Sequence, residues 1–306
     1  MRIFVTGASG WIGSATVLEL IGAGHQVVGL ARSEKSAAAL AEAGAETVRG
    51  TLDDLGVLRD AAAASDGVIH LAFKHESAFS GGFQEAAEAD RRAVEAFGDA
   101  LAGSDRPFVL ASGLLGVAPG RVATERDMPA AEGSPVAVRL GTAAVAVGFA
   151  ERGVRSSVIR LSPTCHGDGD QGFMAALVGL ARRHGASGYP GDGANRWPAV
   201  HRDDAARLFR LAVEKAPAGS MLHGAAEEGV ALREVAEVIG RHLGVPVGPV
   251  ADEDLSERFS WLGGLVGLDA PASSARTREL LDWHPTGPGL LEDLDKGHYF
   301  TAPATA

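Results

Sequence analysis

The sequence begins with a segment that leaves a predicted strand and enters a predicted helix through three closely spaced glycines. The strand covers residues 3–6, and residues 6–13 read Thr-Gly-Ala-Ser-Gly-Trp-Ile-Gly. Gly7 permits a tight turn, Gly10 lets the backbone approach a pyrophosphate, and Gly13 allows the helix to pack closely on the strand. The helix N-terminus adds unpaired N–H donors and the positive end of its dipole. Because both flanks have the required structure, the segment predicts a turn that binds the pyrophosphate of a dinucleotide.

The first half of the chain alternates short β-branched runs with alanine-rich helical stretches. This alternation is typical of a parallel sheet whose crossover helices cover both faces, and such strands are apolar nearly throughout. We therefore predict an α/β fold, a doubly wound parallel sheet of the Rossmann type with a smaller, mixed C-terminal lobe. The expected strands are residues 3–6, 26–30, 46–49, 67–72, 107–111 and 156–161.

Later in the chain the rhythm changes to irregular glycine- and proline-rich segments between helices. We expect the Rossmann domain to span residues 1–161, with residues 196–226 returning to it. Residues 162–195 and 227–300 should form the smaller, substrate-binding lobe over the carboxyl ends of the strands. Residues 301–306 are expected to be a disordered tail.

Charge and cysteine content narrow the possible partners. A formal net charge of -11 would repel a phosphate backbone, so nucleic acid is not an expected partner. The single cysteine, Cys165, cannot form an intramolecular disulfide, and the chain enters a predicted strand at once, so we expect no leader peptide. We therefore expect a cytoplasmic protein. No apolar run reaches membrane-spanning length, and neither an HExxH nor a CxxC spacing suggests a metal.

The Thr-Gly-x-x-Gly-x-x-Gly segment resembles that of the extended short-chain dehydrogenase/reductases. This group of NAD-dependent epimerase/dehydratase-like proteins includes nucleotide-sugar epimerases, dihydroflavonol reductases and 3β-hydroxysteroid dehydrogenases. Five later blocks resemble the same family. They are the turn at the adenine ring (50–54), the fourth strand (68–72), the segment passing the nicotinamide (160–164), the return from the second lobe (197–204) and the late helix and turn (280–285). The resemblance covers nearly the whole chain and implies a nicotinamide cofactor.

The end of the second predicted strand indicates which cofactor is bound. Members that prefer NAD usually carry an acidic residue there, whereas this chain has Arg32 followed by Ser33. These side chains suit the 2′-phosphate of NADP(H), although Arg32 could also be a solvated loop residue. Asp53 could accept the adenine amino group or cap the following helix. We predict NADP(H), with cofactor contacts from Gly7, Ser9, Gly10, Trp11, Ile12, Gly13, Arg32, Ser33, Leu52, Asp53, Leu71, Ala72, Phe73, Pro163 and Thr164.

The catalytic pair typical of the family is missing from the expected helix. Its reductases use a Tyr-x-x-x-Lys pair, in which the tyrosine transfers a proton and the lysine lowers the tyrosine pKa. Residues 134–143 contain neither. In the register that we prefer, Arg139 takes the place of the tyrosine and Ala143 that of the lysine. The chain therefore resembles an atypical subgroup that keeps the cofactor motif without this pair.

Other side chains must then handle the substrate and its proton. Ser112, at the end of the fifth strand, could hydrogen-bond a substrate carbonyl or cap its own turn. We favour Lys74 and His75 as the catalytic pair, because they follow the fourth strand at its carboxyl end, where ligands of open α/β sheets bind. Arg139 could act as an electrostatic clamp. We expect Asp204 to cap the helix of residues 205–213. Weaker candidates, each more typical of a structural role, are His70, His166, Tyr189 and His201.

These features favour an NADPH-dependent reductase acting on a C=O, C=N or activated C=C bond of a small, mostly apolar metabolite. The missing tyrosine favours imines and conjugated alkenes, which need a weaker or different proton donor than ketones. A lyase or epimerase that retains its cofactor and a non-catalytic NADP(H)-sensing protein are the alternatives. The alanine-rich helices near residues 86–101 and 143–150 could form the two-fold bundle of a homodimer or simply cover the sheet. Residues 259–268 could be a substrate lid, a subunit contact or core of the small lobe.

Overall fold

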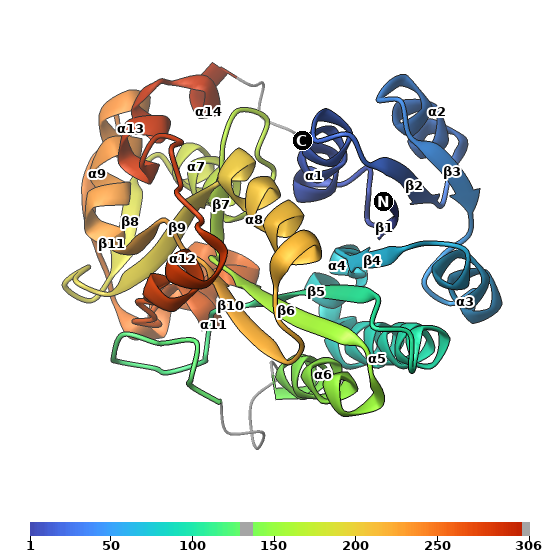
Figure 1. Cartoon of the computed structure of the whole chain (residues 1–306). Helices are drawn as coiled ribbons and strands as arrows, with labels where there is room; N and C mark the ends of the chain where they lie inside the picture. Colours follow the sequence, from blue (N-terminus) through green and yellow to red (C-terminus); the bar gives the residue numbers. More distant parts are fainter. Residues whose placement is uncertain (129–136, 302–306) are drawn as a thin grey trace.

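A seven-stranded parallel sheet forms the centre of the computed structural model, which describes residues 1–128 and 137–301 (Figure 1). Its strand order is β10-β6-β5-β4-β1-β2-β3, so the direction of winding reverses between β1 and β4. This arrangement confirms the predicted doubly wound α/β fold. The strands are β1 (Arg2–Thr6), β2 (Gln26–Ala31), β3 (Glu46–Arg49), β4 (Gly67–His70), β5 (Pro107–Gly113), β6 (Arg155–Leu161) and β10 (Ser220–Gly224).

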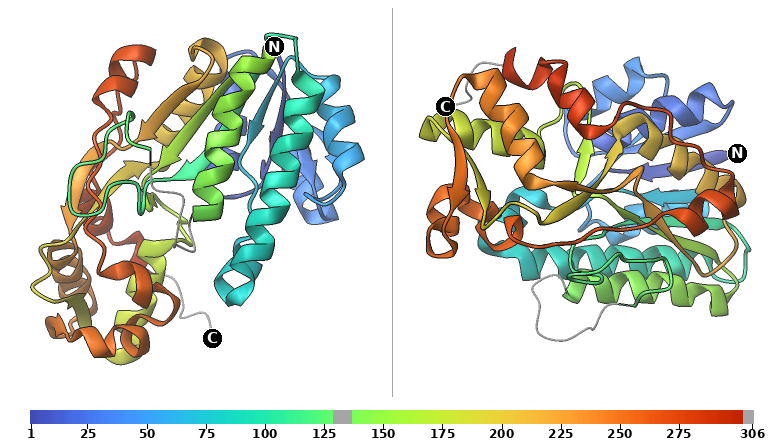
Figure 2. Two further views of the ribbon diagram at one scale, coloured as in Figure 1. Left: turned by 90° about the horizontal axis from the view of Figure 1, so that it is seen from below. Right: turned by 90° about the vertical axis from the view of Figure 1, so that its left-hand side faces the viewer.

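Helices cover both faces of this sheet because successive side chains of each strand point to opposite sides. In β1, Ile3 and Val5 pack in the core beneath α1, α2 and α8, whereas Phe4 packs in the core beneath α3, α5 and α6. Figure 2 shows α5 and α6 side by side on the second face. These helices are α1 (Trp11–Gly22), α2 (Glu34–Glu42), α3 (Leu55–Ala63), α5 (Phe83–Leu101), α6 (Ala137–Gly148) and α8 (Arg202–Lys215).

The fourth strand is shorter than its sequence predicts. It ends at His70 rather than Ala72, because the backbone N–H of Ala72 turns to the Thr6 hydroxyl (3.3 Å) instead of continuing the ladder. The short helix α4 (His75–Ser77) and the turn η1 (Ala78–Gly82) then lead into α5. This bend brings the residues after β4 across the end of β1.

The second lobe contains two small sheets, and this confirms its predicted mixed character. One has the order β11-β9-β7, from β7 (Thr164–His166), β9 (Arg196–His201) and β11 (Glu227–Ala231); the other pairs β8 (Ser187–Pro190) with β12 (Val247–Val250). Phe259, Leu262 and Val266 are buried in the core of this lobe, which favours the core interpretation of residues 259–268. Its helices and short turns are α7 (Phe173–His184), α9 (Leu232–Leu243), η3 (Asp252–Asp254), α10 (Leu255–Phe259), η4 (Ser260–Leu262) and α11 (Gly263–Val266), and η2 (Phe149–Arg152) follows α6.

The prediction that Asp204 caps a helix is wrong. Helix α8 begins at Arg202, and its cap is His201, whose Nδ1 accepts from the backbone N–H of Asp203 (3.3 Å). Asp204 therefore lies in the first turn, buried, where its carboxylate accepts from the backbone N–H groups of Thr286 (2.9 Å) and Gly287 (2.8 Å).

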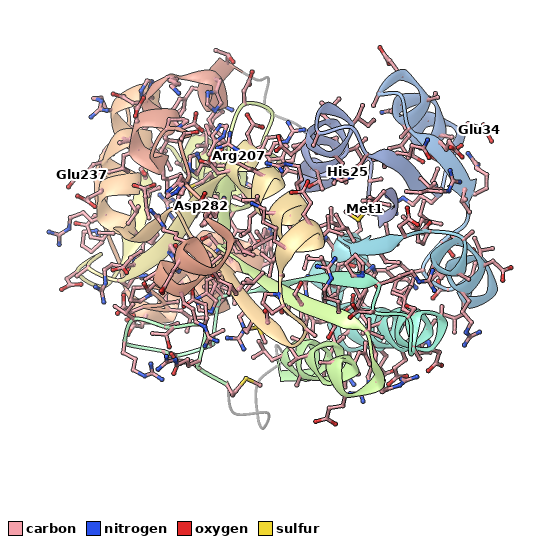
Figure 3. All side chains as sticks on the ribbon, viewed as in Figure 1. Met1, His25, Glu34, Arg207, Glu237 and Asp282 are labelled. Atoms are coloured by element: carbon pink, nitrogen blue, oxygen red, sulfur yellow. The ribbon has the colours of Figure 1, made fainter. Side chains whose placement is uncertain are left out.

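These contacts fasten the C-terminal segment, α12 (Ala275–Leu281), α13 (Leu290–Asp295) and α14 (His298–Thr301), to the rest of the chain. The buried Trp283 donates from Nε1 to the Asp204 carbonyl (3.1 Å). On the surface, Arg207, labelled in Figure 3, donates to the Thr286 hydroxyl (3.2 Å) and to the His284 carbonyl (3.3 Å). The chain thus returns across α8 before it closes the second lobe.

Candidate active site

The carboxyl edge of the parallel sheet gathers the residues that the sequence predicted for cofactor binding. The glycine-rich turn follows β1, Arg32 and Ser33 follow β2, and Asp53 follows β3. Residues 71–75 follow β4, and Ser112 lies at the end of the adjacent β5. This edge includes the point between β1 and β4 where the winding reverses, which is where open α/β sheets bind ligands.

The glycines of the turn lie where a Cβ would meet backbone atoms. Gly7 has φ +66°, and a Cβ there would lie 2.7 Å from the Ala72 nitrogen. A Cβ on Gly13 would overlap the backbone of Gly7, so the helix touches the turn directly. Gly10 is the N-cap residue of α1 and has no side chain to cap the helix. Backbone N–H groups at this helix end are therefore available to an anion.

Arg32 is the exposed cation at the end of β2. Its side chain retains 73% of its accessibility, and its partner, Glu76 at 3.3 Å, is even more exposed. An exposed pair of this kind contributes about 0–1 kcal/mol, so Arg32 can be recruited by a phosphate at little cost. Ser33 caps α2, because its hydroxyl accepts from the Ser36 N–H (3.2 Å).

Lys74 and His75, the favoured catalytic pair, have different surroundings. The Lys74 ammonium donates to both carboxylate oxygens of Asp53 (2.9 and 2.7 Å), which turns it toward the end of β3. His75 retains solvent exposure, and its ring lies 5.1 Å from that of Phe73. The surrounding protein atoms, followed by repulsion from Arg139, lower the pKa of His75 to about 4. His75 is therefore neutral at pH 7.

Arg139, near the start of α6, reaches the residues that follow β4. Its guanidinium carbon lies 4.1 Å from the centre of the Phe73 ring, a cation–π contact. Burial lowers the pKa of Arg139, and the carboxylate of Asp90 opposes that effect, but the group stays charged at neutral pH. Its Nε is buried without a hydrogen-bond partner among the described residues.

Asp90 is a buried carboxylate that the sequence interpretation missed. It lies on the inner face of α5, with Oδ1 3.2 Å from Nε2 of His70, and Nδ1 of that ring is 2.5 Å from the Thr6 hydroxyl. His70 is thus fixed between strand and helix, which suits a structural role. A signal was present, because Asp90 falls on the apolar stripe of Ala86, Ala93 and Phe97 at helical spacing.

Ser112 is another buried polar group on this edge without a hydrogen-bond partner among the described residues, as are Nε2 of His70 and Nε of Arg139. The residue is 4% exposed, and its Oγ makes no hydrogen bond within the part of the chain that the structure describes. It does not cap its own turn, so the alternative interpretation of this hydroxyl is not supported. Helix α6, which carries Arg139, packs on β5, which carries Ser112.

The segment after β6 has structural hydrogen bonds of its own. The Ser162 hydroxyl donates to the Gly224 carbonyl (2.8 Å) and the Thr164 hydroxyl to the Pro198 carbonyl (2.5 Å), with Pro163 between them. Trp11 donates from Nε1 to the Cys165 carbonyl (2.8 Å). This last bond ties β7, at the end of the predicted nicotinamide segment, to the start of α1.

The other candidates contact one another or residues of the second lobe. His166 is buried, with Nδ1 2.9 Å from Asp293, and its ring is 5.4 Å from that of His201. Tyr189 lies beneath Arg233, whose guanidinium carbon is 5.1 Å from the ring centre. No local pattern could indicate Asp293, since it lies 127 positions after His166 in the chain.

The described residues hold no group of three or more His, Cys, Asp or Glu side chains placed to bind a metal ion. Within the same part of the chain, no helix combines the length and apolarity needed to cross a membrane.

The fold and its edge define a dinucleotide-binding Rossmann protein of the extended short-chain dehydrogenase/reductase class. Residues 3–222 match the model of the NAD dependent epimerase/dehydratase family. The chain therefore belongs to that family, as its motifs predicted.

Several proteins are similar over most of their length. An uncharacterized protein of Schizosaccharomyces pombe is 45% identical over 98% of this chain and 100% of its own. The 2′-dehydrokanamycin reductase of Streptomyces kanamyceticus is 30% identical over 82% of this chain and 69% of its own. The fold is similar to that of DesIV, a dTDP-glucose 4,6-dehydratase of Streptomyces venezuelae solved with NAD bound, with a TM-score of 0.78, 21% identity and coverage of 97% of this chain and 96% of that one.

Proposed function

We propose that the protein is an NADP(H)-dependent reductase of a C=O, C=N or activated C=C bond in a small, mostly apolar metabolite. The observation that carries this proposal is the pair of buried, unpartnered polar atoms on the ligand-binding edge, Ser112 Oγ and Arg139 Nε. A buried polar atom without a partner costs about 1–3 kcal/mol. Because α6 packs on β5 at this edge, these two donors favour a ligand oxygen as the missing acceptor.

The residues of the edge fit the proposed cofactor. A Cβ would fill the space beside Gly7, and Gly10 leaves the start of α1 uncapped, which suits a pyrophosphate. β2 ends at Ala31 and is followed by Arg32 rather than by an acid, which supports NADP(H) over NAD. Asp53, Leu52 and residues 71–73 would border the adenine and ribose groups, and Pro163 and Thr164 the nicotinamide ring. When bound, this cofactor would supply a hydride.

The chain's own groups would bind and polarise the substrate. Arg139 would hold the oxygen by its charge and Ser112 by a hydrogen bond, and both would be worth more there than in water because the site is buried. Lys74, held by Asp53, would act as an electrostatic support rather than as a freely moving acid. The named activity of the 2′-dehydrokanamycin reductase supports a reductase here. We also propose a cytoplasmic location and a homodimer.

A second candidate is an epimerase or dehydratase that keeps its cofactor through the cycle. The family match and the similarity of the fold to DesIV favour it. The two candidates differ in net redox change, because only a reductase consumes its reduced cofactor.

The test is a titration of the purified protein with NADPH and NADH by nicotinamide fluorescence, followed by a panel of ketones, imines and enones. We expect tighter binding of NADPH and consumption of the cofactor with some members of the panel. Arg139→Met and Ser112→Ala should slow consumption while NADPH still binds. Binding without consumption across the panel would support a cofactor-retaining or sensing protein, and absence of binding would remove the basis for all three functions.

A further inference from the structure

The charge of Arg139 limits which substrates the proposed site accepts. An arginine stays protonated at physiological pH, so it can stabilise negative charge but cannot donate its proton. Its guanidinium stacks on Phe73, and no carboxylate of the described chain lies within ion-pair distance of it. Asp90, the carboxylate that partly offsets the charge of Arg139, has Oδ1 3.2 Å from Nε2 of His70. The charge of Arg139 is therefore only partly offset by the protein.

The described side chains around Arg139 are poor proton donors. His75 is neutral at pH 7, and a neutral imidazole is a weak acid. Lys74 is held by both oxygens of Asp53. His70 is buried between Thr6 and Asp90. Among the described side chains none is placed to protonate the product at once, which favours a reaction whose product anion persists until water protonates it.

The three bond types of the proposed function differ in this respect. Reduction of a simple ketone forms an alkoxide, a strong base that needs a proton donor at once. An imine is reduced as its iminium cation, which Arg139 would repel. Addition of hydride to the β carbon of an enone moves the C=C electrons toward the carbonyl and forms an enolate. Its charge rests largely on oxygen, where Arg139 and Ser112 can hold it.

We infer that Arg139 and Ser112 form a site for an anionic oxygen, and that the substrate is an α,β-unsaturated carbonyl compound rather than an imine. This inference rests on the proposed reductase function. The balance is one hydride from the reduced nicotinamide to the β carbon and one proton from water to the α carbon. The carbonyl is restored in the saturated product, and the oxidised cofactor leaves.

The site can be tested without turnover, using 4-nitrophenol as a stable analogue of the enolate. We would titrate the full-length protein with NADP⁺ present, following the absorbance of the phenolate. The wild-type protein should bind phenolate about 10–100-fold more tightly than phenol, because an opposite charge lies beside the oxygen. Arg139→Met should abolish this preference, Ser112→Ala should weaken it, and Arg139→Lys should keep part of it.

Two further variants separate this role from a general effect of charge. Arg92→Met removes an exposed cation of α5 and should leave the phenolate preference unchanged. Asp90→Asn removes the carboxylate that partly offsets the charge of Arg139, and it should increase the phenolate preference. If Arg139 served only to neutralise Asp90, Arg139→Met and Asp90→Asn would change the preference little, and the inference would be wrong.

Turnover separates the failure of this inference from that of the proposed function. With NADPH, an enone should be reduced and its saturated ketone and a cyclic iminium should not, and Arg139→Met should lower kcat/KM for the enone about 10²–10³-fold. Reduction of the ketone or iminium but not the enone would overturn the inference and leave the reductase intact. No consumption with any of the three, together with phenolate preference, would support the anionic-oxygen site and contradict the reductase.

Discussion

The hydroxyl of Tyr299 donates a hydrogen bond to Asp170 (2.9 Å) and accepts one from the backbone N–H of Gly167 (3.2 Å). Tyr299, one of the chain's two tyrosines, is thus buried near the C-terminus and hydrogen-bonded to the loop that follows β7. Burial, with the nearby Asp170 carboxylate, raises the pKa of Tyr299 far above its ordinary value. Its hydroxyl therefore keeps its proton at neutral pH.

Tyr299→Phe should therefore destabilise the protein without acting on proton transfer. The change leaves the Gly167 N–H and the Asp170 carboxylate each without one partner, and we expect a loss of about 1–3 kcal/mol. Denaturant unfolding measures this loss. The pH dependence of kcat with the best substrate should keep its shape. A shifted profile would instead identify Tyr299 as the proton donor that replaces the missing family tyrosine.

Arg32→Ala should weaken NADPH binding about 10–100-fold and leave NADH binding unchanged. A charge-assisted contact to the 2′-phosphate is lost, whereas the exposed pair with Glu76 contributes little to the free protein. Fluorescence titrations with both cofactors measure the effect. Arg49→Ala, which removes a neighbouring exposed cation paired with Glu34, is the matched control and should change neither affinity. Equal losses for NADPH and NADH would contradict the predicted cofactor preference.

Asp204→Ala should cost about 2–4 kcal/mol of unfolding free energy, because the buried N–H groups of Thr286 and Gly287 lose their acceptor. Asp203→Ala is the control. Its carboxylate is adjacent in sequence but 74% exposed, so its loss should change stability by less than about 1 kcal/mol. Thermal or urea unfolding of both variants tests the difference. Similar values for the two would show that the C-terminal segment is fastened elsewhere.

The sequence was informative where a residue's role depends on its immediate neighbours. The spacing of the glycines in residues 7–13 predicted a tight turn, and the structure contains its close backbone contacts. Apolar runs predicted the parallel strands. Periodicity could not predict where β4 leaves the ladder, because that end depends on the Thr6 hydroxyl of another strand. The domain boundaries and the cofactor residues stay predictions, and residues 134–136 of the expected catalytic helix lie outside the described residues.

Roles that depend on distant partners were beyond sequence reasoning. Aspartate is common at helix caps, yet the carboxylate of Asp204 accepts from backbone N–H groups more than 80 residues later in the chain. Lys74 follows a strand as a catalytic lysine would, yet it pairs with Asp53 from the turn after β3. In both cases the local pattern is compatible with several partners, and only tertiary packing selects one of them.

The pairing of Asp293 with His166 predicts an acid-sensitive contribution to stability. Burial alone would raise the pKa of Asp293, but the hydrogen bond from His166 (2.9 Å) and the charges of His166, His298 and His201 outweigh it, so the pKa is lowered. The stabilisation is therefore fully present above the unfolded carboxyl pKa, about 4, and is lost as the pH falls through the lower folded value. At pH 7, Asp293→Asn should lower Tm by several degrees.

The difference in Tm between wild type and Asp293→Asn should shrink as the pH falls below about 4, because the wild-type carboxylate then becomes protonated and loses the same interaction. Scanning fluorimetry between pH 3 and 7 measures this convergence. Glu292→Gln, an exposed neighbour on α13, is the control and should follow the wild-type curve throughout. A difference between wild type and Asp293→Asn that stays constant down to pH 3 would mean that the side chain stabilises the lobe by packing rather than by its charge.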